Sequence, residues 1–346
     1  MEHNRLPLYE AQPRPHRSLQ LALFVASITW VIVATVVAAR AARGLAIRFQ
    51  LNDGFLLLNA IFLLFLVIVG LVVLEGIANR NTPIRRTIGL PRRPTAATEW
   101  GTGAALGWGI VLVSVLTMAL AGALHVRIWL EPRSLWLAFL NLITLGILAL
   151  ASEIAFRGYA YRCLINAMGT SWATVVISIV FAIITTLNQE GTYLSTFIAI
   201  LFSTILCAAW HRTHGLWFGW GLHFAWIASI GILFGLPVNG FDTLSSVVQT
   251  RAIGLTWLTG GDLGPEGALL MPLLLLAALI VLYRVTRDWW WHYTHAPIIA
   301  GGYPMDVAPP PAHAAMENKP ASAPALVQIL PSTSQSRSVE PDTSSE

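Results

Sequence analysis

The most regular feature of the chain is a series of long, uninterrupted apolar runs separated by short polar segments. The runs cover residues 19–39, 55–77, 104–124, 135–151, 172–186, 192–210, 216–233 and 269–285. A helix that crosses a bilayer needs about 20 predominantly apolar residues, whereas the strands of a membrane barrel alternate between apolar and polar positions. The pattern therefore predicts an all-α integral membrane protein with about eight transmembrane helices.

The composition agrees with a location in the membrane. Hydrophobic residues make up 55% of the 346 positions and charged residues only 11%, whereas about 25% of residues are charged in soluble domains. The net charge is +4, but most arginines lie in short segments between the apolar runs, where such residues act as topology signals. We therefore expect the lipid bilayer as a partner and no nucleic acid.

The distribution of arginine predicts how the chain is oriented. Cytoplasmic segments of membrane proteins carry an excess of arginine and lysine. With the N-terminus inside, the inner segments hold more arginines than the outer ones, although Arg40, Arg43 and Arg48 follow the first run and count as an outer loop. We expect a multi-pass protein of the plasma or inner membrane with both termini in the cytoplasm.

Two further segments lack the features of a membrane span. Residues 238–267 are rich in glycine and polar residues, which favours a re-entrant or lid segment. From residue 296 onward, proline, alanine and serine dominate, and such a composition buries too little apolar area to fold. The predicted organisation is a cytoplasmic N-terminal segment (1–18), two N-terminal transmembrane helices with a basic loop (19–99), a membrane core (100–290) and a disordered tail (296–346).

Ionisable and polar residues in the apolar runs are candidates for function, because each charge there costs about 2.5–3.5 kcal/mol or more. Glu153 and Arg157 are four positions apart and share one face of a helix, where they serve either chemistry or only a structural lock. His223 lies in a tryptophan-rich run and is either a core residue or a catalyst. Asn188 follows the run 172–186, in a polar turn or beside a site.

A metal site has little support from the residues themselves. His211 and His214 are spaced to bind one ion, but no third ligand is evident nearby. Glu153 and His223 likewise supply two ligands, whereas a catalytic zinc ion usually has three protein ligands. The residues therefore indicate no cofactor.

Three motifs resemble those of one family of intramembrane proteases. The segments are SEIAFRGY at residues 152–159, FAIITTLN at 181–188 and RTHGLWFGWGLHFAWI at 212–227. They are similar to the Glu-Glu-x-x-x-Arg, Phe-x-x-x-His and His-x-x-x-Asn motifs of the CAAX prenyl protease type II and bacteriocin-processing (CPBP) family. LTGGDLGPEGALL, at 258–270, looks like a segment common in bacterial members. The resemblance covers about residues 100–285.

The resemblance implies an endopeptidase that cleaves lipidated or transmembrane peptides within the membrane. In the family, the first glutamate and the second-motif histidine activate a water, and the third-motif histidine and asparagine hold the oxyanion. A divalent metal is a cofactor that the resemblance also allows. In this chain the matching positions hold Ser152, Thr185 and Ile227, so that only Glu153 and His223 remain, with Arg157 in support.

Three hypotheses about function follow. The first is an active protease with a rearranged site built on Glu153 and His223. The second, which the substitutions Ser152, Thr185 and Ile227 favour, is an impaired or inactive homologue, a pseudoenzyme that binds prenylated, lipidated or transmembrane peptides without cleaving them. The third is a transporter or permease-like protein, which the lack of an internal repeat disfavours. The fold expected for all three is a helical bundle with a cavity shaped by about its last five helices.

Overall fold

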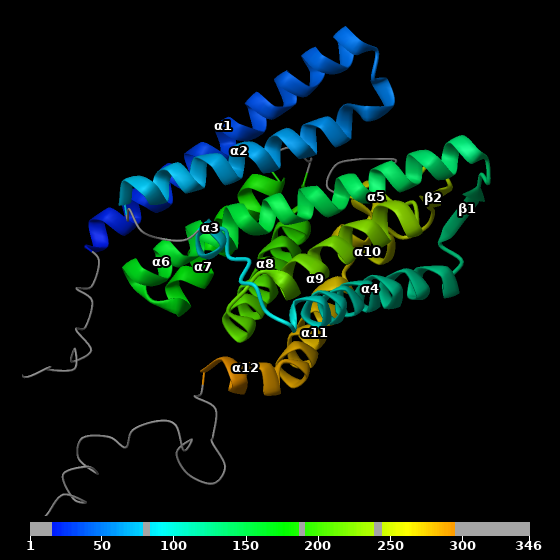
Figure 1. Cartoon of the computed structure of the whole chain (residues 1–346). Helices are drawn as coiled ribbons and strands as arrows, with labels where there is room; N and C mark the ends of the chain where they lie inside the picture. Colours follow the sequence, from blue (N-terminus) through cyan, green and yellow to red (C-terminus); the bar gives the residue numbers. More distant parts are fainter. Residues whose placement is uncertain (1–15, 79–83, 187–190, 239–243, 295–346) are drawn as a thin grey trace, which may run out of the picture. The chain divides into compact units, whose positions relative to one another are not determined.

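Apolar helices make up most of the structure, a computed structural model that describes residues 16–78, 84–186, 191–238 and 244–294 (Figure 1). Within these residues, six segments are long and apolar enough to cross a membrane, and two further apolar helices are shorter. The six are α1 (Arg17–Phe49), α2 (Phe55–Ala78), α4 (Ala96–Leu120), Pro132–Met168, α8 (Tyr193–Thr213) and Gly261–Val285. The all-α, multi-pass membrane fold is confirmed, whereas the number of eight crossings stays a prediction.

The remaining elements are short or lie within these segments. Pro132–Met168 consists of α5 (Pro132–Glu153), a π-helical stretch (Ile154–Ala160) and α6 (Tyr161–Met168). The two shorter apolar helices are α7 (Thr170–Thr186) and Trp217–Leu233, which is α9 (Trp217–Ala228) with a second π-helical stretch. The others are α3 (Ile84–Thr87), β1 (Leu124–Ile128), β2 (Val248–Ala252), α10 (Thr256–Thr259), α11 (Met271–Val285) and α12 (Arg287–Thr294).

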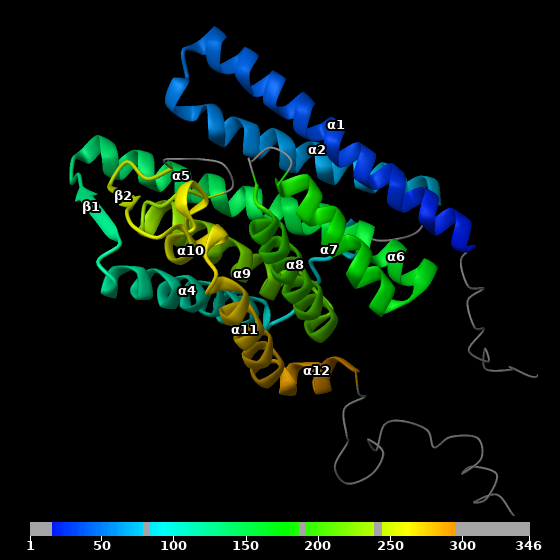
Figure 2. The same cartoon turned by 180° about the vertical axis from the view of Figure 1, so that it is seen from behind.

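The helices of residues 16–294 pack in layers (Figures 1 and 2). The pair α1 and α2 forms the outermost layer and packs against α5 and α6. Next come α7, α8 and α9, with α9 against α5 and α7 against α8. On the far side, α4 runs along α9, and α11 packs on α8 and α4. The helices that carry the three motifs are therefore the inner ones.

Helix α1 is longer than the first apolar run. It extends to Phe49, so that Arg40, Arg43 and Arg48 belong to the helix. The expectation that these arginines form an outer loop is therefore wrong. The reason is that alanine and arginine are good helix formers. A buried row of small residues continues past the apolar run, formed by Ala34, Ala38, Ala42 and Ala46. This row lies on the inner face of the helix.

The span 135–151 also continues beyond its predicted end. The helix starts at Pro132, whose fixed φ suits the first helical turn, and it runs without a break to Met168. Its π-helical stretch, Ile154–Ala160, contains Arg157. Single π-turns within α-helices occur frequently at functional sites, and this one carries most of the first motif.

Helices α4 and α9 approach each other closely through glycine. A Cβ atom at Gly103 or Gly107 would overlap the carbonyl oxygen of Phe218 or Leu222, respectively. From the opposite side, a Cβ atom at Gly221 would overlap the carbonyl oxygen of Trp100. Small residues four apart are a common means of close packing between membrane helices. The contact sets the position of α9, the helix with His223.

One two-stranded sheet is present that the sequence pattern does not predict. Strands β1 and β2 pair antiparallel, with Leu124 opposite Ala252 and Ile128 opposite Val248. Segment 238–267 thus holds β2, α10 and a short 3-10 stretch (Gly261–Gly267), although residues 239–243 lie outside the described part. We expected that this segment would not be a membrane-spanning helix, and its described part is not a single helix. Its role as a lid stays a prediction. The predicted tail, 296–346, also lies outside the described residues.

Candidate functional site

Glu153, Arg157 and His223 form one buried polar group. Oε1 of Glu153 accepts a hydrogen bond from Nη1 of Arg157 at 3.3 Å and another from Nδ1 of His223 at 2.8 Å. Glu153 and Arg157 are fully buried, and His223 is 7% exposed. The pairing that the four-residue spacing predicts is present, and it brings the first motif into direct contact with the third.

Arg157 has partners on three sides. Besides Glu153, its Nη2 donates to Oγ of Ser203 at 2.7 Å. Its guanidinium carbon lies 4.4 Å from the centre of the Phe181 ring, where the ring face attracts a cation. A buried charge is tolerated when it is paired and hydrogen-bonded in this way. The arginine therefore holds Glu153 in place from within the bundle.

A cavity of about 390 Å³ lies next to this group. His223 lines it, and so do Ser152, Thr185 and Ile227, the three residues that the motif resemblance leads us to expect at the site. Glu153 and Arg157 lie behind the wall and are not among the lining residues. The three motifs thus converge on one cavity, but the carboxylate of Glu153 is turned toward Arg157 and His223.

The N-terminal helix pair also contributes to the cavity, which corrects the expectation that about the last five helices shape it. Val31 and Thr35 of α1 and Leu63 and Val67 of α2 are part of the lining. The rest of the apolar wall comes from α5 and its π-helical stretch, from α7, α8 and α9, and from Val238 and Leu244. The resemblance to the family starts near residue 100, so it gave no reason to place α1 and α2 at the site.

Glu266 is a cavity residue that the sequence analysis did not single out. It lies in the 3-10 stretch before α11, and its Oε1 accepts a hydrogen bond from Nε1 of Trp226 at 3.0 Å. Both Glu266 and Trp226 line the cavity. The available signal was its place in the segment 258–270, which resembles bacterial family members. Asn188, the predicted supporting residue, lies outside the described residues.

The donor set does not fit a resident metal ion. Within the described ranges, no group of three or more His, Cys, Asp or Glu side chains comes together in a way that would hold one. Glu153 already accepts from Arg157 and His223. Two donors are fewer than the three protein ligands usual for catalytic zinc, so no step is assigned to a metal.

His211 and His214 lie outside the cavity, where α8 ends. Their ring centres are 6.0 Å apart and meet edge to face. Burial, followed by the charges of His211 and Arg93, lowers the pKa of His214 below its ordinary value. The residue is therefore neutral near pH 7 and adds no charge beside Arg93, which suits an interfacial turn.

The tryptophans of α9 fix the orientation of that helix. Nε1 of Trp217 donates to the carbonyl oxygen of Pro91, and Nε1 of Trp220 donates to that of Gly146, each at 2.9 Å. With the bond from Trp226 to Glu266, three indole groups attach α9 to three different segments. Because His223 lies between these anchors, its ring has a defined direction in the bundle.

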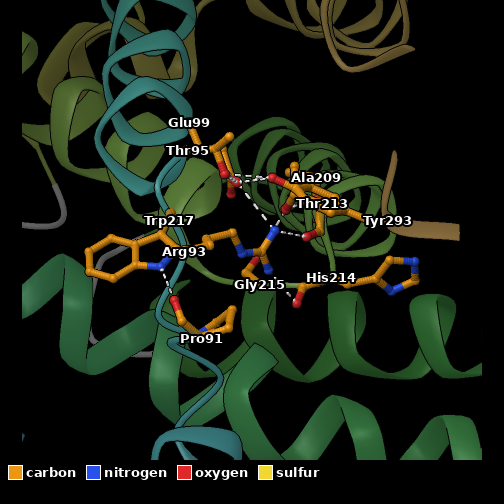
Figure 3. Close-up of polar contacts among 10 residues, drawn as sticks. All are labelled: Pro91, Arg93, Thr95, Glu99, Ala209, Thr213, His214, Gly215, Trp217 and Tyr293. Atoms are coloured by element: carbon orange, nitrogen blue, oxygen red, sulfur yellow. Dashed lines mark hydrogen bonds and ion pairs between the residues drawn. The ribbon is translucent and has the colours of Figure 1, made fainter. Parts of the chain in front are cut away.

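Arg93 secures the turn that leads into α9 (Figure 3). Nη1 donates to the carbonyl oxygen of Thr213 at 2.7 Å, and Nη2 donates to that of His214 at 3.0 Å. These carbonyls belong to the C-terminal end of α8, where helical partners are lacking. A cation is also favoured at that end of a helix, so Arg93 acts as its cap.

Glu99 completes the network around Arg93 from the first turn of α4 (Figure 3). This fully buried carboxylate accepts from Nη1 of Arg93 at 3.2 Å, from Oγ1 of Thr95 at 2.8 Å and from the hydroxyl of Tyr293. Arg93 also lies over the Tyr293 ring. The network joins α4, the end of α8 and α12.

Replacing Arg93 with alanine should lower stability by about 2–4 kcal/mol, since charged hydrogen bonds contribute about 1.5–3 kcal/mol each and are not additive. Thermal unfolding in detergent measures the loss, and hydrogen exchange should rise at the turn 213–216. Arg92→Ala is the matched control, because Arg92 is an exposed neighbour of the same type. Equal effects of the two variants would contradict the capping role.

Comparison with known proteins identifies one family that part of the chain resembles. Residues 131–229 match the family model described as type II CAAX prenyl endopeptidase Rce1-like. No curated protein and no solved structure matches significantly. The matched range contains α5, the π-helical stretch, α7, α8 and α9, which are the elements that bring Glu153, Arg157 and His223 together. This part of the chain is therefore similar to the Rce1-like family of type II CAAX prenyl endopeptidases.

Proposed function

We propose that the protein binds a prenylated, otherwise lipidated or transmembrane peptide in its cavity and does not cleave it. The observation that carries the proposal is the lining itself, which includes Ser152, Thr185 and Ile227. The motif resemblance aligns these three residues with the family's catalytic positions. The wall is otherwise mostly apolar, as is typical of sites for hydrophobic ligands. The similarity of residues 131–229 to the Rce1-like endopeptidase family supports a peptide as the ligand.

Loss of cleavage follows from what peptide hydrolysis requires. A general base contributes about 10²–10⁴ in rate, and an oxyanion donor about 10²–10³. Glu153 is turned away from the cavity, toward Arg157 and His223. Ile227 has no hydrogen-bond donor in its side chain for an oxyanion. A site without these groups still offers a surface for binding.

The runner-up is cleavage through a rearranged site. It is favoured by the 2.8 Å contact from Nδ1 of His223 to Oε1 of Glu153, because a carboxylate that orients histidine is a recurrent arrangement of general bases. An oxyanion donor would still be needed. A transporter or permease would need a polar path, which the mostly apolar lining does not supply.

The proposal is tested with purified protein in nanodiscs and a farnesylated CAAX-type peptide, or a transmembrane peptide, that carries a fluorophore. Wild type should bind in the micromolar range or better, and mass spectrometry should find the peptide intact. Ala199→Phe fills the cavity and should weaken binding at least tenfold. Phe197→Trp adds bulk to an exposed position of α8 and should leave binding unchanged.

Cleavage by wild type would overturn the proposal in favour of the rearranged protease. Equal binding by Ala199→Phe would mean that the peptide lies elsewhere. The triple variant Ser152→Glu, Thr185→His, Ile227→Asn returns the family's catalytic groups to the cavity wall. New cleavage by this variant would support the view that the cavity presents the peptide in a cleavable position.

A further inference from the structure

The two-stranded ribbon formed by β1 and β2 has two unlike faces. Side chains alternate between the faces of a strand, and the register places Val126 opposite Thr250 and Ile128 opposite Val248 on one of them. Val126 and Ile128 are exposed. This face is therefore mostly apolar and is not covered by the bundle at these two positions.

The other face of the ribbon is polar and basic. His125 lies directly opposite Arg251, and Arg127 lies opposite Gln249, so that Arg127 and Arg251 are diagonal neighbours. All four side chains are exposed. No acid stands at a strand position of this face, and the acid nearest to β1 in the sequence, Glu131, follows only after the strand has ended. The face therefore carries positive charge without a counter-charge in either strand.

This arrangement is unfavourable for the ribbon by itself. Like charges that face each other across an antiparallel pair destabilise it. Among the residues that the structure describes, the ion pairs include neither Arg127 nor Arg251. Proteins break such local rules mainly at functional positions. An anion from outside the chain would offset the repulsion between the two arginines.

The position of the ribbon indicates which anion this is. Strand β1 connects α4 to α5, and both helices belong to segments long enough to cross a bilayer, so the ribbon stands at a membrane boundary. Trp129 directly follows β1, Trp257 lies in α10 shortly after β2, and both are exposed. Tryptophan is enriched at the interface between membrane and water. The anions concentrated at this level are the headgroups of acidic phospholipids.

We propose that the basic face of the ribbon binds the headgroups of anionic phospholipids, with Arg127 and Arg251 as the residues that hold the phosphates. The apolar face, with Val126 and Ile128, then lies toward the acyl chains, as the apolar side of an amphipathic helix does at a membrane surface. Charge complementarity and the direct continuation into α4 and α5 favour a lipid as the partner. This role of the ribbon is independent of peptide binding in the cavity.

The test measures which lipid lies beside the ribbon. A fluorophore is attached to Leu255→Cys, an exposed position shortly after β2, and the two native cysteines are buried. The protein is placed in nanodiscs of phosphatidylcholine and phosphatidylglycerol, in which one lipid or the other is brominated and quenches the fluorophore. At low salt, phosphatidylglycerol should be enriched at least about fivefold, because each arginine near an anionic surface contributes roughly that factor. The enrichment should fall at high salt.

The double variant Arg127→Gln, Arg251→Gln should reduce the enrichment to less than about twofold. Both side chains are exposed, so the unfolding temperature in detergent should stay the same. Arg48→Gln is the matched control, since Arg48 is an exposed arginine at the end of α1, outside the ribbon, and it should keep the enrichment.

Equal quenching by the two lipids in wild type, or an enrichment that survives in the double variant, would overturn the lipid-binding role. So would an enrichment that disappears in Arg48→Gln as well, because the total charge of the protein would then attract the lipid. Inorganic phosphate, added at constant ionic strength, distinguishes a headgroup from a free anion. The enrichment should persist, since the bilayer holds its phosphates at the ribbon, and displacement of the lipid by phosphate would contradict binding to a lipid surface.

Discussion

Glu153→Gln is expected to destabilise the protein by about 3–5 kcal/mol, the usual cost of leaving a buried charge without its partner. Glutamine has the size of glutamate and can still accept from Nδ1 of His223, so the change removes mainly the negative charge. Arg157 would then keep Ser203 and the Phe181 ring but no anion. Unfolding in detergent by heat or by a denaturing surfactant measures the effect.

Two further variants isolate the ion pair. Glu131→Gln makes the same chemical change at an exposed residue and should alter stability by less than about 0.5 kcal/mol. Arg157→Met removes the cation, and the double variant Glu153→Gln, Arg157→Met should cost less than the sum of the two single changes, by about 1–3 kcal/mol. Additive losses, or a Glu153→Gln protein as stable as wild type, would contradict a charged pair in the bundle.

Hydropathy predicted the positions of the helices well because lipid-facing apolar runs are a strong signal. Hydropathy did not predict where the helices end, because helix propensity and charge pairing also determine the ends. Arg40, Arg43 and Arg48 continue α1, since arginine favours a helix once one is formed. Arg157 lies within a continuous helix because its charge is paired inside the bundle. A local average of hydropathy contains neither effect.

Contacts between distant segments were not visible in the sequence. Strands β1 and β2 are more than a hundred residues apart, and a five-residue strand has too little pattern to be identified alone. Glu266 likewise reaches the cavity only because Trp226 and the stretch before α11 meet there. Such placements follow from tertiary packing, which no periodicity in either segment encodes.

The candidate site was predicted in part, through motif spacing. The resemblance identified Ser152, Thr185, Ile227 and His223, and the structure gathers all four at one cavity. The four-residue spacing predicted the pair of Glu153 and Arg157, but nothing in the sequence indicated the contact of Glu153 with His223, because it joins two distant helices. The contribution of α1 and α2 was missed, since the resemblance begins after them.

Replacing Gly107 with valine is expected to cost at least about 3 kcal/mol, the upper end of the usual range for overpacking. The added Cβ atom would overlap the carbonyl oxygen of Leu222, which is backbone and cannot turn aside as a side chain could. Helices α4 and α9 would have to separate, which would displace His223 from Glu153. Thermal unfolding in detergent and peptide binding should therefore both be affected.

The same helix supplies the control. Gly101 lies two positions before Gly103, is exposed, and has no atom within 4 Å of an added Cβ atom. Gly101→Val should therefore leave stability nearly unchanged, although it alters helix propensity as Gly107→Val does. Gly221→Val disrupts the same contact from the side of α9, because its Cβ atom would overlap the carbonyl oxygen of Trp100. It should lower stability by about as much as Gly107→Val. If Gly101→Val and Gly107→Val behaved alike, propensity and not the close approach of the two helices would set the position of α9.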